Sequence, residues 1–192
     1  NLMAASFENF ILRPGTENMY RVAMDFSANI EKNKKGLLGF GPVGNGKSHL
    51  FASIHHQAVR EGYVSLFIDC SRLFIMRDDA KKFSSNISIN EIVNSAIKCD
   101  LLTLDEIGSG SLTDDEYSDI LFPIINCRSG KRTNFTTNLD LDELARWFSI
   151  DKFGKPLDTN GRLIDRILDD CEVVKNTGTS KRKENAMKRM GN

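Results

Sequence analysis

The 192-residue sequence lacks the features that mark several classes of protein. It has no net charge, because 26 Lys and Arg balance 26 Asp and Glu. This excludes a wholly basic, histone-like nucleic-acid binder and leaves room only for a local basic patch. No apolar run approaches the roughly 18 residues of a membrane span, and no signal-peptide pattern is present. These absences predict a cytoplasmic protein with no membrane partner.

Cysteine is scarce, and its positions are scattered along the chain. No C-x-x-C pair occurs, and the three histidines lie near none of the cysteines, which are Cys70, Cys99, Cys127 and Cys171. Zinc sites need clustered soft ligands. We therefore expect reduced, mostly buried thiols and no metal held by Cys or His.

What remains is an ordinary globular composition, 40% hydrophobic and 27% charged, in a chain of single-domain length. Strand-length apolar runs alternate with segments of helical periodicity. The predicted strands are 36–40, 63–68, 101–104, 132–137 and 172–175. The predicted helices are 47–60, 71–82, 90–97, 113–127, 140–148 and 161–168. This alternation predicts an α/β sandwich with five parallel strands covered by helices on both faces. The basic tail, 181–192, is expected to be flexible.

One glycine-rich loop carries a strong signal. Residues 41–48 fit the pattern G-x-x-x-x-G-K-[ST], between a predicted strand and a predicted helix. The glycines let backbone N–H groups surround a phosphate, and the helix N-terminus favours an anion. Lys47 is expected to reach the β- and γ-phosphates, and the Ser48 hydroxyl to ligate Mg²⁺. The predicted nucleotide-binding residues are Gly41, Pro42, Val43, Gly44, Asn45, Gly46, Lys47, Ser48 and His49.

Two acids follow the third predicted strand, as in a Walker B motif. Asp105 is expected to hold Mg²⁺ through water, and Glu106 to polarise the attacking water. Both lie at the carboxyl end of a parallel strand, where ligands bind in such sheets. The identity of the nucleotide is predicted from two motifs that the sequence lacks. No N-K-x-D motif follows a strand, and no arginine-rich lid is present, so ATP hydrolysis is favoured over GTP hydrolysis or small-molecule kinase chemistry.

These motifs, with Asn138 after the next strand and with Arg162 and Arg166 in a late helix, resemble the AAA+ ATPases. The resemblance is to the DnaC/DnaI group of bacterial replicative helicase loaders, with IstB-type transposition ATPases as a sister family. Three further stretches support it: Ala5–Phe10, Leu121–Asn126 and Gly178–Arg182. It covers nearly the whole chain and implies a P-loop NTPase domain over residues 1–180.

The resemblance implies roles for several residues. Asn138 would be sensor 1, and Arg166 an arginine finger that enters the ATP site of a neighbouring copy, so that the chain self-associates through that site. Arg162 is the competing finger, and the plain alternative is a solvated Arg166 paired with Asp169 or Asp170. The implied cofactors are ATP and Mg²⁺. The implied partners are a hexameric replicative helicase and single-stranded DNA.

Two departures from the group are expected. Only 26 residues follow Arg166, since the chain ends at residue 192, which is too few for a multi-helix lid. The lid is therefore expected to be truncated, and the group's N-terminal helicase-binding domain to be absent. The leading prediction is an ATP-dependent helicase loader. The alternatives are an IstB-like helper of a transposase and a nucleotide-sensing adaptor that does not hydrolyse ATP.

A DNA contact is predicted on the helix after the second strand. Its cations are interleaved with Phe74 and Phe83, so that bases could stack while the cations track phosphates. The cations are Arg72, Arg77, Lys81 and Lys82. The alternative is an ordinary amphipathic helix with Phe74 in the core. The basic tail, 181–189, is a second candidate for the DNA contact.

Overall fold

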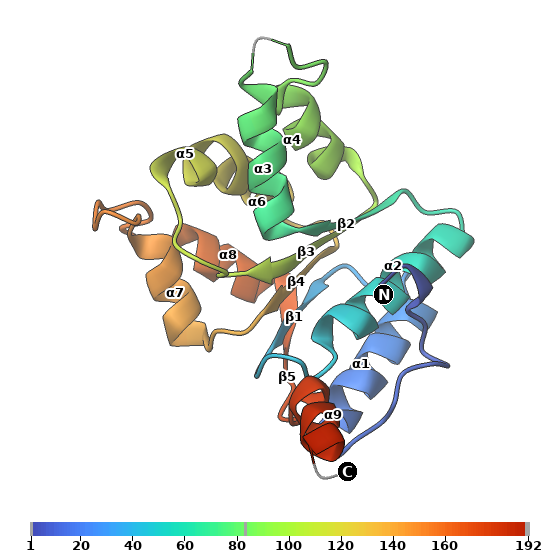
Figure 1. Ribbon diagram of the computed structural model, residues 1–192. Helices are drawn as coiled ribbons and strands as arrows, with labels where there is room; N and C mark the ends of the chain where they lie inside the picture. The colour runs from blue at the N-terminus through green and yellow to red at the C-terminus, as the bar shows by residue number, and fades with distance from the viewer. Residues whose placement is uncertain (1, 83, 191–192) are drawn as a thin grey trace.

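A computed structural model of the chain describes residues 2–82 and 84–190 and contains a sheet of five parallel strands (Figure 1). The strands are β1 (Gly36–Phe40), β2 (Ser65–Asp69), β3 (Leu101–Ile107), β4 (Thr133–Thr137) and β5 (Cys171–Lys175). Their order across the sheet is β2-β3-β4-β1-β5, and all neighbours run parallel. The predicted α/β class and the five parallel strands are confirmed.

Helices cover both faces of this sheet, and α1 and α2 lie on the opposite side from α3, α4, α6, α7 and α8 (Figure 1). The longer helices are α1 (Glu17–Ala28), α2 (Lys47–Arg60), α3 (Cys70–Ala80), α4 (Ile89–Lys98), α7 (Leu141–Ser149), α8 (Arg162–Asp170) and α9 (Lys181–Met190). The short ones are η1 (Leu2–Ala4), α5 (Asp114–Glu116), the π-helical η2 (Tyr117–Leu121) and α6 (Phe122–Cys127).

The core consists of two apolar clusters, one on each face of the sheet. Adjacent strand residues alternate between them, because successive side chains of a strand point to opposite faces. Leu37 and Leu101 pack against α1 and α2, whereas Leu38 and Leu102 pack in the cluster formed with α3, α4, α6, α7 and α8. Three layers result, as predicted.

The helix predicted over residues 113–127 is interrupted. It forms α5, the π-helical η2 and α6 in succession, with Pro123 in the first turn of α6. Proline has no N–H to donate to the preceding turn, and a π-helical turn accommodates such a break.

Two of the longer helices, α1 and α9, were not predicted. The N-cap residue of α1, Thr16, is of a type that favours helix starts, but its side chain makes no capping bond. The third helical residue is Met19, so the sequence has no capping box at this position. Helix α9 lies where the sequence predicted a flexible tail. Among the described residues, no helix combines the length and the apolar character that crossing a membrane requires.

Candidate nucleotide site

The loop between β1 and α2 turns on glycines with left-handed backbone. Gly41 has φ 138° and Gly46, the N-cap of α2, has φ 100°. A Cβ on Gly41 would lie 2.1 Å from the carbonyl oxygen of Asn176, and one on Gly46 would lie 2.6 Å from the ring of Phe10. Only glycine therefore fits at both positions. The loop leads directly into the N-terminus of α2, where N–H groups and the helix dipole favour an anion.

Lys47 is buried at the start of α2, and its ammonium is surrounded by oxygen atoms. The Nζ atom donates to the carbonyl oxygens of Gly41 (2.7 Å) and Pro42 (2.9 Å) and to Oδ1 of Asn138 (2.8 Å). Burial lowers the pKa of Lys47 to about 8, although the negative charges of Asp105 and Glu106 oppose this shift. The phosphate loop and the residue predicted as sensor 1 thus meet at one ammonium group.

The two predicted acids, Asp105 and Glu106, lie near the carboxyl end of β3, beside the same lysine. Asp105 is 3% exposed, and burial raises the pKa of its carboxyl group, against hydrogen bonds from Thr136 and Ser48 that lower it. Ser48 and Asp105 therefore lie close together and offer a hydroxyl and a carboxylate, the hard oxygen donors that suit Mg²⁺. The residues fit a magnesium–nucleotide complex. The described residues contain no cluster of three or more His, Cys, Asp or Glu side chains that would hold a metal by themselves.

A cleft of about 330 Å³ opens between these elements, within the range of small-molecule sites. Its lining residues are Leu2, Val43, Gly44, Asn45, Gly46, Lys47, Ser48, His49, Glu106, Asn138 and Lys181. Most of the predicted site residues therefore share one cleft. Gly41 and Pro42 do not line the cleft, but their carbonyl oxygens accept hydrogen bonds from Lys47 Nζ. The His49 ring lines the cleft and also contacts the Ser6 carbonyl oxygen, with Nε2 at 2.9 Å from it.

Two segments distant in the sequence support the phosphate loop, and sequence reasoning missed both. Asn45 Nδ2 donates to the Asn176 carbonyl (3.1 Å), Asn176 Nδ2 donates back to the Asn45 carbonyl (3.4 Å), and both residues are fully buried. The Arg13 guanidinium donates to the carbonyl oxygens of Asn45 (3.4 Å) and Thr179 (2.8 Å). The one available signal was that Asn176 directly follows the last predicted strand, at the carboxyl edge of the sheet.

A family model described as IstB-like ATP-binding protein matches residues 9–189. The chain belongs to this family. The matched range contains the phosphate loop, both acids, Asn138 and the late helix with Arg162 and Arg166. This is a family of ATP-binding AAA+ ATPases. The family match therefore confirms the resemblance to AAA+ ATPases that the sequence motifs indicated.

Individual relatives of this IstB-like chain come from two groups. It is 26% identical over 188 residues to the replicative helicase loader DnaI of Bacillus subtilis (strain 168). This alignment covers 95% of this chain and 60% of DnaI. It is 29% identical over 107 residues to an ATP-binding protein of insertion sequence IS1162 from Pseudomonas fluorescens, covering 56% of this chain and 45% of that protein. A crystal structure of DnaI matches with a TM-score of 0.75 and 27% identity, over 94% of this chain and 92% of that one. The fold is thus that of the AAA+ proteins, and the chain spans 45% to 60% of these two curated relatives.

The two finger candidates lie outside the chain's own cleft. Arg166 is half-buried in the middle of α8, where it lines a small hollow with Arg128 and Asp170, and among the described residues it forms no ion pair with Asp169 or Asp170. Arg162 is exposed at the first residue of α8. Because α8 leads into the amino end of β5, Arg162 lies toward the carboxyl edge of the sheet. Of the two arginines, Arg162 therefore has the more accessible side chain.

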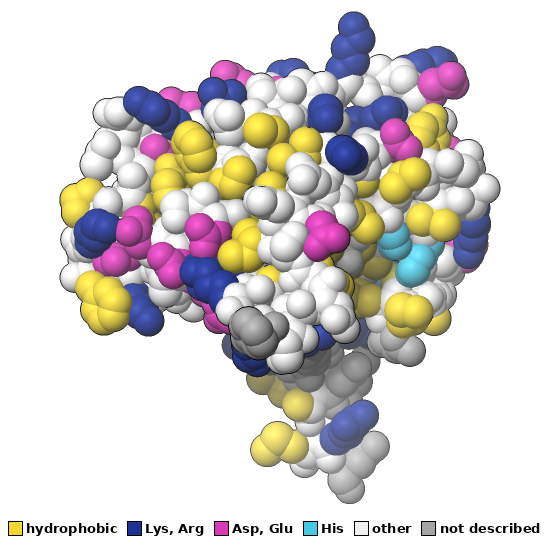
Figure 2. Space-filling model, turned by 90° about the horizontal axis from the view of Figure 1, so that it is seen from above, with side chains coloured by type: hydrophobic (Ala, Val, Ile, Leu, Met, Phe, Trp, Pro, Cys, Tyr) yellow, Lys and Arg dark blue, Asp and Glu magenta, His cyan; other side chains and the backbone are white. Residues whose placement is uncertain are grey.

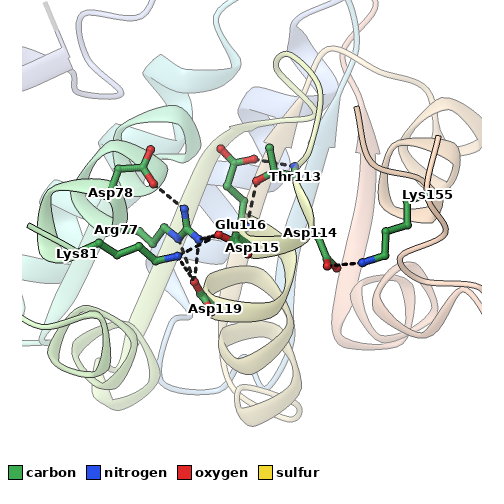
Figure 3. A network of polar contacts seen from close by, with 9 residues as sticks. All are labelled: Arg77, Asp78, Lys81, Thr113, Asp114, Asp115, Glu116, Asp119 and Lys155. Atoms are coloured by element: carbon green, nitrogen blue, oxygen red, sulfur yellow. Dashed lines mark hydrogen bonds and ion pairs between the residues drawn. The ribbon is translucent and has the colours of Figure 1, made fainter. Parts of the chain in front are cut away.

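The cations predicted to contact DNA are mostly held in ion pairs (Figure 3). The Arg77 side chain is 7% exposed and pairs with Asp78 (2.6 Å), Asp115 (2.5 Å) and Asp119 (2.9 Å). Lys81 shares Asp115 (3.0 Å) and Asp119 (3.2 Å).

The remaining members of that set differ from one another. Lys82 pairs with Asp79 at 2.6 Å, and Arg72 is exposed and has no ion pair in the described part of the chain. Phe74 packs against the core, whereas Phe83 lies outside the described residues. Figure 2 shows basic and acidic side chains interspersed on the face seen from above, with no continuous basic stripe. DNA contact by α3 stays a prediction, and these ion pairs argue against it for Arg77.

Proposed function

We propose that this chain binds ATP with Mg²⁺, hydrolyses it, and uses the cycle to load a replicative helicase onto single-stranded DNA. The observation that carries the proposal is the convergence at Lys47. Its ammonium joins the phosphate loop to Asn138, and Glu106 lines the same cleft. A loop that only binds a phosphate has no need of an acid and an amide at this position.

Each residue has a distinct task in this reaction. The Lys47 ammonium and the loop N–H groups hold the phosphates, and Ser48 and Asp105 hold the metal, Asp105 through water. The chemistry that Mg²⁺ supplies in such a site is neutralisation of charge on the phosphate oxygens. The Glu106 carboxylate accepts a proton from the attacking water, and the Asn138 amide orients that water or the terminal phosphate.

The neighbouring copy completes the site in this proposal. An arginine from α8, Arg162 or Arg166, enters from the next subunit and stabilises developing phosphoryl charge with a planar, permanently charged group. Neither arginine lines the cleft of its own chain, which supports a role in another copy. Hydrolysis by a single copy is therefore slow.

Helicase loading is favoured because the likeness to DnaI extends over 95% of this chain, whereas the likeness to the IS1162 protein extends over 56%. The second candidate, assistance of a transposase, is supported by the IstB-like family model. The third, a nucleotide-sensing adaptor, binds ATP without turnover.

One set of assays separates the three candidates. The wild type, Lys47→Ala and Glu106→Gln are compared for release of inorganic phosphate and for capture of the source organism's replicative helicase with ATP and without it. A loader hydrolyses ATP, captures the helicase in a nucleotide-dependent way and delivers it to a single-stranded circle. Turnover without helicase capture, but with capture of a transposase, supports the second candidate. Tight ATP binding without turnover, in the presence of helicase and DNA, supports the third.

A further inference from the structure

The two acids at the end of β3 face one residue of β4. Leu104 pairs with Phe135, but Ile107 pairs with Thr137, so Asp105 and Glu106 together lie opposite Thr136. This is the arrangement of a β-bulge, which inserts one extra residue into a strand. The core shows the same shift, because Leu104 and Ile107 belong to one apolar cluster although strict alternation would place them on opposite faces.

The bulge places Glu106 in an unusual conformation. Its φ is +56°, which makes it the one residue other than glycine with a positive φ in the described part of the chain. Such a backbone is uncommon for a residue with a side chain and persists only where the surroundings hold it. The consequence is favourable for the site, because Glu106 lines the cleft while Asp105 stays buried beside Ser48.

A single hydroxyl group holds both acids. Thr136 Oγ1 donates to Oδ1 of Asp105 at 2.5 Å and accepts the backbone N–H of Glu106 at 2.9 Å. Thr136 is fully buried, so no solvent competes for these bonds. The hydroxyl therefore fixes the carboxylate of one acid and gives the N–H of the other a partner in its left-handed conformation.

We propose that Thr136 is a positioning residue for ATP hydrolysis, and that its hydroxyl sets the Asp105 carboxylate for the metal and the Glu106 carboxylate for the attacking water. The inference rests on the proposed hydrolysis of ATP. Asn138, two residues further along the chain, contacts Lys47. The end of β4 thus orients the acids through Thr136 and the lysine through Asn138.

The chain offers a matched control for this proposal. Thr103 on the neighbouring strand β3 is also fully buried, but its hydroxyl has no hydrogen-bond partner among the described residues. Replacement of either threonine by valine keeps the shape and removes the hydroxyl. Only at Thr136 does that hydroxyl contact the site.

The test compares Thr136→Val, Thr136→Ser and Thr103→Val for phosphate release and for the Mg²⁺ dependence of binding of a fluorescent ATP analogue. Removal of a group that orients a metal ligand typically lowers activity or metal affinity by about 10- to 100-fold. We expect Thr136→Val to lower kcat by this factor, to raise the Mg²⁺ concentration needed for binding, and to leave KM for ATP near the wild-type value. Thr136→Ser keeps the hydroxyl and recovers most of the rate, and Thr103→Val behaves as the wild type.

The proposal is overturned if Thr136→Val retains the wild-type kcat and Mg²⁺ requirement, or if Thr136→Ser is as impaired as Thr136→Val. Equal impairment of Thr103→Val also overturns it, since packing alone then explains the loss. If melting curves show that Thr136→Val does not fold, Thr136→Ala removes the same hydroxyl without the added methyl group and takes its place. If the wild type releases no phosphate, the proposed hydrolysis fails, whereas the Mg²⁺ titration of the variants still decides the role of Thr136.

Discussion

The ion-pair cluster around Arg77 predicts that this residue stabilises the fold and contributes little to DNA binding. In Arg77→Met, the buried side chain keeps its length and loses its charge. Hydrogen bonds to a charged group contribute about 1.5–3 kcal/mol when shielded, whereas exposed ion pairs contribute about 0–1 kcal/mol. The Asp78 and Asp115 side chains are 62% and 63% exposed, so the main loss is the contact with Asp119, which is 32% exposed.

We therefore expect Arg77→Met to lower the free energy of unfolding by about 2 kcal/mol. For a domain of this size that corresponds to a fall in Tm of roughly 4–8 °C, which thermal denaturation followed by circular dichroism measures. The matched control is Arg72→Met, on the same helix, because the Arg72 side chain is exposed and has no ion pair among the described residues. We expect the Tm of this control to match that of the wild type.

Fluorescence anisotropy with a labelled single-stranded oligonucleotide, at several salt concentrations, gives the second readout. Each lost phosphate contact lowers the log–log salt slope by about 0.7 on a single strand. Arg77→Met should leave the slope unchanged, whereas Arg72→Met lowers it if α3 contacts DNA. A wild-type Tm together with a reduced slope in Arg77→Met would refute the structural role of this arginine.

Three further predictions concern the nucleotide site. Lys47→Ala removes a charged partner of the phosphates, so calorimetry should show ATP affinity falling by about 10- to 100-fold, and an unchanged Kd would contradict the assigned site. The pKa of Lys47 lies near 8 in the free protein, and the negative charge of bound phosphate raises it. ATP binding should therefore take up a proton and weaken as the pH rises through about 8, and calorimetry in buffers of different ionisation enthalpy detects the proton uptake. ATP affinity that does not change from pH 7 to 9 would count against this. Glu106→Gln should lower the rate of ATP hydrolysis by about 10²-fold and leave ATP binding intact. When this variant is mixed with Arg166→Ala or with Arg162→Ala, some interfaces pair an intact Glu106 with an intact arginine. Turnover should recover only in the mixture whose substituted arginine acts in trans.

The sequence predicted those features whose causes are local. The helix over residues 47–60 has the predicted bounds. The helix predicted over residues 140–148 is α7, and its N-cap residue Asp140 accepts the Glu143 N–H through Oδ1 at 2.8 Å. Both follow from patterns within a few residues. The position of Asp105 and Glu106 near the carboxyl end of β3 also agrees with the sequence, because an apolar run precedes them.

The features that were missed depend on contacts between distant segments. The reciprocal amide bonds of Asn45 and Asn176 join residues 131 positions apart. Two of the three carboxylates that pair with Arg77, Asp115 and Asp119, come from α5 and η2, up to 42 positions away. From the sequence alone, Arg77 cannot be told apart from the other cations of the helix predicted over residues 71–82. Only the tertiary placement of those aspartates shows that it is buried and paired.

The sequence did contain a signal for polar contacts within the sheet, in the composition of β4. All five residues of this inner strand, T-N-F-T-T, are buried, and four of them are polar. Inner strands of parallel sheets are ordinarily rich in Val, Ile and Leu, and a buried polar group costs free energy unless it is hydrogen-bonded. Here Thr133 accepts from Arg128 Nε (2.8 Å), Asn134 Oδ1 accepts the Leu37 N–H (2.8 Å), and Thr136 bridges the two acids. The polar residues of β4 therefore serve different ends: Thr133 and Asn134 contact the neighbouring elements, and Thr136 contacts the two acids of the site.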